Sequence, residues 1–189
     1  LERDRMGLSS STEYLGSGSW VQAGSQFGTF GNTAYALDTL FRTDTGQRPN
    51  EDLEQLTVSA KFKQQIGPAD SIYFQTIYYD FESGDVAQYF DPTSAHRRLR
   101  AKESQEPILL AGYHHEWGPG NHSLLLFGRL QDTYAVTDPD QSALILSKSD
   151  TGQLRGVSVL PTPLAYQSEF EAYTAEVQQI WQREKHSAI

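Results

Sequence analysis

The segment HHEWGPGNH, residues 114 to 122, holds the densest group of side chains that could bind a metal. Imidazole and carboxylate groups are suitable zinc ligands, but a zinc site needs three or four of them to converge. Alternation along a strand turns successive side chains to opposite faces. His114 and Glu116 would then share one face, whereas His115 and His122 would share the other without a carboxylate. We therefore expect structural or interfacial histidines and no metal or other cofactor.

Pairs of carboxylates suggest a second kind of chemistry. Glu169 and Glu171, or Asp80, Glu82 and Asp85, could flank a sugar as general acid and base. Such pairs are also ordinary on solvated loops and pore walls. No nucleophile elbow, phosphate-binding glycine loop, zinc-protease motif or EF-hand loop occurs in the sequence. A polysaccharide-degrading enzyme stays an alternative, but no catalytic residue is predicted and the protein is expected not to be an enzyme.

Composition narrows the function classes further. The 189 residues suit one domain, and the formal charge of −9 argues against a nucleic-acid partner. The only dense basic stretch, HRRLRAK at 96–102, is followed at once by a carboxylate. The absence of cysteine excludes disulfides and thiolate metal sites. No run approaches the roughly 20 apolar residues that a membrane-spanning helix needs.

The elements that would carry these residues are strands. Period-two alternation is common along the chain, and helical periodicity is weak. Short turns are expected at 31–32, 67–70, 118–121 and about 183–185, and longer polar connections at 43–52, 82–105 and 135–167. Most strands between them have ten residues or more. Long strands joined alternately by tight turns and long loops are typical of an outer-membrane β-barrel.

Pairing each hairpin about its turn predicts two unlike faces. With Ile66 opposite Ser71, the apolar face collects Leu56, Val58, Ala60, Phe62, Tyr73, Ile77, Tyr79 and Phe81. With Trp117 opposite His122, Leu109, Ala111, Tyr113, Leu124, Leu126 and Leu130 lie together. Charged side chains lie opposite them and would line a wet lumen; the candidates are Lys61, Lys63, Glu116, Arg129 and Glu176.

Aromatic residues lie beside each tight turn. The candidates for an interfacial girdle are Phe30, Tyr73, Trp117 and Trp181. Amphipathic rings favour the level where hydrocarbon gives way to water. On this interpretation HHEWGPGNH is a periplasmic turn with the strand ends that flank it.

Four segments together resemble a known group of proteins: GNTAYALDTLFRTDTGQRPNEDLEQL, DSIYFQTIYYDFESGDVAQYFDP, QEPILLAGYHHEWGPGNHSLLLFGRLQDT and AEVQQIWQ. The chain is similar to the β-barrel region of bacterial tetratricopeptide-repeat outer-membrane proteins. The resemblance implies a Gram-negative-type outer membrane and helical repeats upstream of the barrel, and it implies no catalytic residue. Its architecture also resembles that of exopolysaccharide export porins, in which the repeats gather partners and the barrel passes the polymer.

The sequence therefore predicts an all-β, antiparallel up-and-down meander that is part of an outer-membrane β-barrel. Residues 1–18 would be a linker or the end of a preceding strand, and 19–189 a partial barrel of about seven strands with the start of an eighth. Further strands are expected beyond both ends. The expected function is a channel, an export pore or an anchored scaffold, with the bilayer, lipopolysaccharide and an exported polysaccharide as partners. The alternative is a soluble β-sandwich that binds carbohydrate on an aromatic face.

Overall fold

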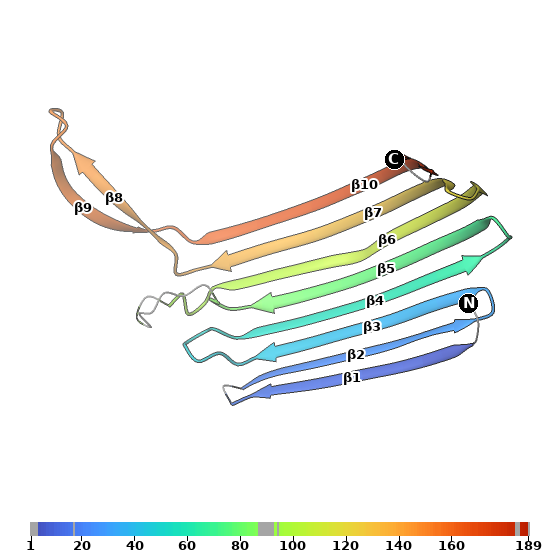
Figure 1. Ribbon diagram of the computed structural model, residues 1–189. Coiled ribbons are helices and arrows are strands. Elements are labelled where there is room, and N and C mark those ends of the chain that lie inside the picture. Colours follow the sequence, from blue (N-terminus) through green and yellow to red (C-terminus); the bar gives the residue numbers. More distant parts are fainter. Residues whose placement is uncertain (1–3, 17, 87–92, 94, 184–185, 189) are drawn as a thin grey trace.

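The computed structural model describes residues 4–16, 18–86, 93, 95–183 and 186–188. Nine strands form one sheet in the order β1-β2-β3-β4-β5-β6-β7-β10-β11, and β8 and β9 form a separate hairpin (Figure 1). Their bounds are β1 Arg5–Leu15, β2 Ser19–Phe30, β3 Thr33–Asp44, β4 Leu53–Gln65, β5 Asp70–Ser83, β6 Arg100–Gly118, β7 Asn121–Asp138, β8 Ser142–Lys148, β9 Leu154–Pro161, β10 Leu164–Arg183 and β11 His186–Ala188.

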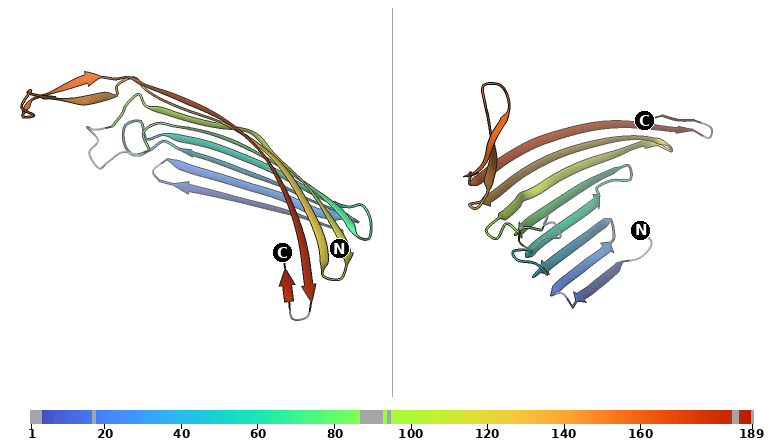
Figure 2. Two further views of the ribbon diagram at one scale, coloured as in Figure 1. Left: turned by 90° about the horizontal axis from the view of Figure 1, so that it is seen from above. Right: turned by 90° about the vertical axis from the view of Figure 1, so that its left-hand side faces the viewer.

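Every strand pairs antiparallel with its neighbours in the sheet. The all-β, up-and-down meander expected from the alternation is thus confirmed. The views in Figure 2 show the sheet as one curved layer. Among the described residues, none belongs to a helix long and apolar enough to cross a membrane.

The connections differ between the two ends of the sheet. At one end, here the turn end, the chain reverses tightly after β2, β4 and β6. At the other, here the loop end, longer segments follow β3, β5 and β7 (Figure 1). The alternation of tight and long connections agrees with the sequence pattern. The connection from Leu15 to Ser19, between β1 and β2, is short although it lies at the loop end.

Three strand assignments differ from the sequence pattern. The expected polar connection 82–105 is shorter, because β5 runs to Ser83 and β6 begins at Arg100. Arg5–Leu15, within the segment interpreted as a linker or strand end, is an eleven-residue strand, β1. The stretch 135–167 was expected to be a polar connection, but it contains the end of β7, the β8–β9 hairpin and the start of β10. This hairpin exposes Leu144, Leu146, Val157 and Val159, and it projects from the loop end of the sheet (Figure 1).

The predicted register of both inner hairpins is wrong by one residue. Gln65, not Ile66, lies opposite Ser71. The Ile66 amide donates to the Asp70 carbonyl, so the chain reverses over the three residues 67–69 and not over the four residues 67–70 that were assumed. In the β6–β7 hairpin a bulge at Trp117 places Glu116 opposite His122. Because side chains alternate with a period of two, a shift of one residue moves a whole strand's side chains to the other face.

The observed register defines two faces, called face A and face B. Face A carries Trp20, Tyr35, Leu37, Phe41, Leu56, Val58, Phe62, Ile72, Phe74, Tyr78, Leu109, Tyr113, Leu125, Phe127, Tyr173, Val177 and Trp181. Face B carries Asp38, Thr57, Ser59, Lys61, Lys63, Tyr73, Ile77, Tyr79, Phe81, Glu103, Gln105, His114, Glu116, His122, Leu124, Leu126, Asp132 and Glu176. A bulge between Glu106 and Leu109 switches the alternation within β6. Pro107 lies in this bulge, where no backbone amide is needed for the ladder, so a proline is tolerated there.

Neither face is covered by a second layer. In the part of the chain that the structure describes, no hydrophobic side chain is fully buried. Val177 on β10 is 74% exposed and Phe127 on β7 is 56% exposed, although both lie within the paired stretch of these two strands. The apolar side chains of this sheet therefore lack the protein interior that normally covers such a surface.

Candidate functional site

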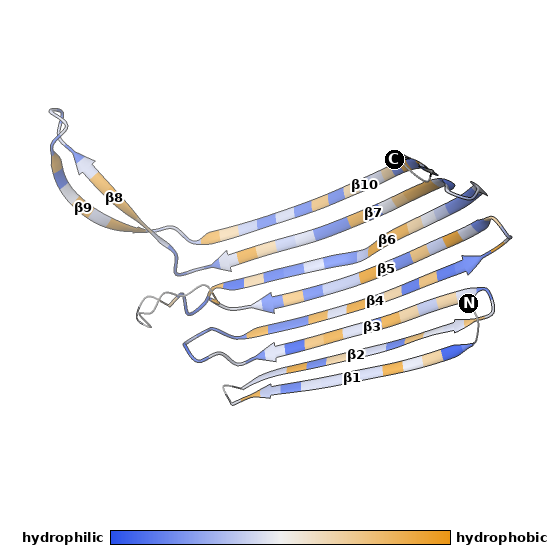
Figure 3. Cartoon of the chain, viewed as in Figure 1, coloured by the Kyte–Doolittle hydropathy of each residue, from blue (hydrophilic) through white to orange (hydrophobic). Residues whose placement is uncertain are grey.

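Face A carries a continuous apolar band. On β4 it runs from Leu56 to Phe62, on β5 from Ile72 to Tyr78, and on β10 from Tyr173 to Trp181. Within these stretches the residues on face A include no Asp, Glu, Lys or Arg. Figure 3 shows apolar and polar residues alternating along the strands. Such alternation produces one face of uniform polarity only if each strand pairs so that its apolar residues lie opposite those of its neighbours. The registers of β4, β5 and β10 meet this condition along the band.

Charged groups limit the band on the side of the loop end. Arg129 lies on face A, where its Nε donates to Glu171 (3.0 Å) and its Nη2 lies 3.6 Å from Glu106. The hydroxyl of Tyr173 also donates to Glu171 (2.7 Å). Arg129 was predicted to share a face with Lys61, Lys63, Glu116 and Glu176, and this prediction is wrong because the bulge at Trp117 shifts the register. Its guanidinium belongs to the border of the apolar band.

Aromatic rings gather on face A near the turn end. Phe30 stacks on Tyr35 with the ring centroids 6.1 Å apart, and His115 meets Trp117 edge-on at 4.3 Å. The Trp117 indole donates to Ser123 (2.8 Å). Trp181, paired with Asn121, is 55% exposed on the same face. Of the four girdle candidates, three therefore lie on one side.

Tyr73 is the exception among the girdle candidates. The observed β4–β5 register places it on face B, opposite Lys63. On face A, Tyr113 is the ring near the turn end that sequence reasoning missed. Its hydroxyl donates to Asp70 (2.5 Å), which also contacts His115 Nδ1 at 2.7 Å. A ring with one apolar side and a polar anchor has the character that the girdle requires.

Face B carries charges along the middle of its strands. Lys61 Nζ lies 3.4 Å from Asp38, which also accepts a hydrogen bond from Ser25 (2.6 Å). Lys63, Glu116 and Glu176 share this face, so the structure places four of the five lumen candidates together. Over residues 56–64 of β4 and 173–181 of β10, face A has no charged side chain to match Lys61, Lys63 and Glu176.

The histidine cluster divides between the faces differently from the prediction. His114 and His122 lie together on face B, with Nε2 and Nδ1 3.0 Å apart, and His115 lies on face A. Glu116 is the cross-strand neighbour of His122. Among the described residues, no group of three or more His, Cys, Asp or Glu side chains is arranged to hold a metal ion. The pair can exchange a proton but cannot complete a zinc site alone.

A shallow hollow of about 520 Å³ lies mainly on face B near the turn end. Gly112 contributes to its floor, because a Cβ there would lie 3.4 Å from the Cβ of Tyr73. Leu124 and Leu126 complete an apolar floor, and Lys63, His114, Glu176 and Gln178 supply polar groups. The hollow therefore combines an apolar floor with a positively charged side chain, Lys63, and a negatively charged one, Glu176.

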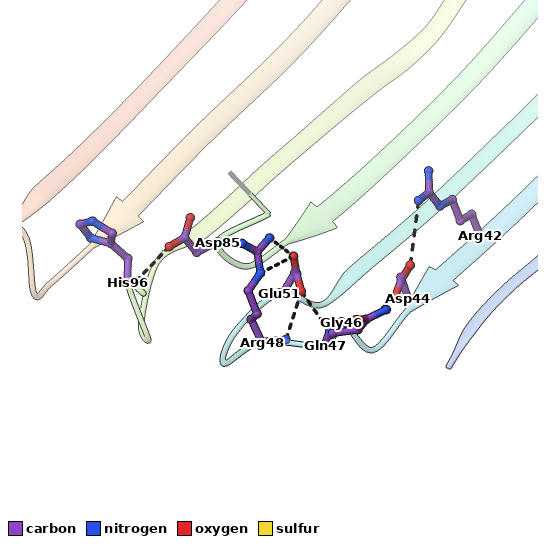
Figure 4. A network of polar contacts seen from close by, with 8 residues as sticks. All are labelled: Arg42, Asp44, Gly46, Gln47, Arg48, Glu51, Asp85 and His96. Atoms are coloured by element: carbon purple, nitrogen blue, oxygen red, sulfur yellow. Dashed lines mark hydrogen bonds and ion pairs between the residues drawn. The ribbon is translucent and has the colours of Figure 1, made fainter. Parts of the chain in front are cut away.

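The long connections at the loop end are fastened to one another. Asn50, at φ 60°, donates to the carbonyl oxygens of His96 (2.7 Å) and Leu99 (2.9 Å). The His96 amide donates to Asp85 (2.9 Å), as Figure 4 shows. His96 Nδ1 lies 2.6 Å from Asp138, a carboxylate with 0% exposure. These contacts join the segments after β3 and β5 to the end of β7.

A second set of contacts orders the segment after β3. Glu51 accepts hydrogen bonds from the Gln47 amide (2.9 Å) and from Arg48 Nε (2.9 Å), and both appear in Figure 4. Hydrogen bonds from Arg48 and from the Gln47 backbone lower the pKa of Glu51 to about 2. The same contact raises the pKa of Arg48. Hydrogen bonds and ion pairs between polar side chains and the backbone therefore hold the segments of the loop end in place.

Comparison with protein-family models, curated proteins and solved structures gave no match for this chain. The arrangement of the two faces is therefore the main ground for a functional conclusion.

Proposed function

We propose that this sheet is an arc of an outer-membrane β-barrel that acts as a channel or export pore, with face A against lipid and face B toward the lumen. The observation that carries the proposal is the separation of charge. Over residues 56–64 of β4 and 173–181 of β10, the charged side chains Lys61, Lys63 and Glu176 all lie on face B, while face A carries no charged side chain in these stretches. Lipid-facing and lumen-facing side chains alternate in this way in membrane barrels.

The height of the band supports the assignment. On β10 the band extends over nine residues, from Tyr173 to Trp181, of which the five alternate ones lie on face A. At ~3.3 Å per residue this stretch extends roughly 30 Å along the strand, and a tilt of about 40° leaves roughly 23 Å. This is close to the ~25 Å apolar band of outer-membrane barrels. The border formed by Arg129 and Glu171 would then lie at the level of the lipid headgroups, where lipopolysaccharide is the expected neighbour.

The turn end would face the periplasm and the loop end the exterior. Short periplasmic turns and long external loops are the usual arrangement. The contacts of Asn50, His96 and Asp138 would hold the external loops as an ordered rim. The resemblance to barrels that follow tetratricopeptide repeats supports the same orientation, with helical repeats on the periplasmic side.

The alternative of a soluble carbohydrate-binding sandwich receives less support. A sandwich packs the apolar faces of two sheets against each other at about 10 Å. Leu56 and Phe62 are instead 37% and 39% exposed on an uncovered face. Ile77 and Leu126, on the other face, are only partly buried.

Folding of the protein into detergent or lipid tests the proposal. We expect the full chain to require detergent, to migrate differently on gels before and after heating, and to conduct ions after reconstitution into planar bilayers. A protein that remains monomeric and folded in water without detergent would contradict the membrane assignment. A folded, inserted protein without conductance would leave an anchored scaffold in place of a channel.

A further inference from the structure

A group of aromatic and acidic side chains occupies face B toward the loop end. The observed register sets Tyr79 opposite Gln105, Gln105 opposite Asp132, and Asp132 opposite Phe170. The next row sets Phe81 opposite Glu103 and Glu103 opposite Tyr134. Acceptor side chains on β6 and β7 therefore lie between or beside aromatic rings on β5, β7 and β10. We call these seven residues the aromatic–acidic patch.

The rings of the patch are arranged as a surface. Tyr79 and Phe81 are nearly parallel, at 8°, with their centroids 6.4 Å apart. Tyr134 meets Tyr166 edge-on at 6.3 Å, and Phe170 is 53% exposed. By contrast, face B of β4 presents Gln55, Thr57 and Ser59 at the neighbouring positions. A group of large rings on a face that would line a wet lumen is typical of a binding surface.

The carboxylates of the patch have unused acceptor capacity. Glu103 accepts one hydrogen bond from Gln105 (3.2 Å). Oδ1 of Asp132 is buried and has no hydrogen-bond partner among the described residues. The cross-strand neighbours of these two carboxylates are Phe81, Tyr134, Gln105 and Phe170, none of which carries a positive charge. A ligand that brings hydroxyl or ammonium donors would pair directly with Glu103 and would be attracted by the negative charge of Asp132.

We propose that the aromatic–acidic patch binds the sugar units of a polysaccharide, and that Glu103 and Asp132 select neutral or amino sugars over acidic ones. A pyranose has C–H groups on its flat sides, which fit the negative face of an aromatic ring, and hydroxyl groups at its edge, which donate to carboxylates and amides. A purely apolar plug would desolvate both carboxylates without pairing them, which is strongly unfavourable. A polyanion would be repelled. This inference rests on the proposed function, in which face B lines the lumen, and it names the cargo of the channel.

Binding of three defined hexasaccharides to the full chain in detergent tests the proposal, with isothermal titration calorimetry as the measurement. The probes are cellohexaose, which is neutral, hexa-glucosamine, which is cationic, and hexa-galacturonate, which is anionic. We expect the cationic and neutral probes to bind and the anionic probe to bind at least tenfold more weakly. Equal affinity for all three probes, or tightest binding of the anionic one, would overturn the selection by Glu103 and Asp132.

Three variants separate the contributions. The double variant Tyr79→Ala, Phe81→Ala should lower the affinity for the neutral probe by roughly tenfold, about 1.4 kcal/mol for the two ring contacts together. The double variant Glu103→Gln, Asp132→Asn should keep neutral binding but lose the preference for the cationic probe. Tyr78→Ala, on face A next to Tyr79, is the matched control and should bind as the original chain does.

The outcomes distinguish this inference from the proposed function. A chain that inserts and conducts but gives the same affinities with and without Tyr79 and Phe81 refutes the sugar patch and leaves the channel. Sugar binding by a chain that does not insert refutes the channel and leaves the patch. If the Tyr79→Ala, Phe81→Ala chain does not fold, the charge preference of the Glu103→Gln, Asp132→Asn chain still decides the result.

Discussion

Strand β4 shows the two faces of the sheet at single-residue resolution. Leu56, Val58 and Phe62 belong to the apolar band, whereas the residues between them, such as Thr57 and Lys61, belong to face B. Neighbouring side chains along one strand are therefore suited to different solvents. A water-soluble sheet would hide one of these faces, but here both are uncovered in the described structure. This difference between the two faces is what the proposed separation of lipid from water depends on.

A charge placed on the apolar band should have the largest effect. We expect Val58→Arg to lower the free energy of unfolding from a bilayer by about 2–4 kcal/mol, as arginine does at the midplane on the lipid face of a barrel. Thr57→Arg, on face B, should cost much less because the lumen is hydrated. Urea unfolding of both variants from lipid vesicles measures the two values. Equal costs would break the distinction between the faces.

Reversal of the charges on face B should have the next largest effect. We expect Lys61→Glu combined with Lys63→Glu to shift the ion selectivity of the reconstituted pore several-fold toward cations, because charged rings set selectivity. Arg129→Glu, on face A, is the control and should leave the selectivity unchanged. Reversal potentials under a salt gradient provide the measurement. If Arg129→Glu changed the ion selectivity and the two lysine substitutions did not, face A and not face B would line the lumen.

The aromatic residues sharpen the comparison at the turn end. In single-tryptophan variants, lipids brominated on their acyl chains should quench the fluorescence of Trp117 and Trp181 by a clear fraction, because both side chains are exposed on face A. Tyr73→Trp in a tryptophan-free background is expected to escape quenching, since Tyr73 lies on face B. Quenching of this residue as strong as that of Trp181 would show that Tyr73 also meets lipid.

The smallest effect is expected at the loop end, in the segment between β3 and β4. The pKa of Glu51 is lowered from 4.5 to about 2 by Arg48 and the Gln47 amide, so folding stabilises the charged form. Its contribution to stability is present above pH 4.5 and is lost as the pH falls toward 2, because the unfolded chain takes up the proton first. Glu51→Gln should remove this part of the pH dependence. Hydrogen exchange of the 45–52 amides at pH 6 and pH 3 measures it, and an identical pH response in both chains would contradict the assignment.

Much of the architecture could be predicted from the sequence. Alternation and turn residues such as Gly118 and Pro119 indicate a meander with tight turns at one end. The β8–β9 hairpin escaped prediction although its alternate positions Leu144 and Leu146 are apolar, because it lies inside a long connection between Pro139 and Pro163. The aromatic–acidic patch could not be predicted either, since its members come from four strands and meet only through the registers.

The amino-acid sequence by itself determined which residues alternate, where the chain turns, and that lysine and glutamate share strands with leucine and valine. Only the tertiary structure decided which face of the sheet carries the apolar residues of each strand. Side chains repeat every two residues, so one residue fewer in the turn before Asp70, or one more at the Trp117 bulge, reverses a face. Turn length and bulges depend on pairing with the neighbouring strand, and for this reason Tyr73 and Arg129 could be placed only once the sheet was seen.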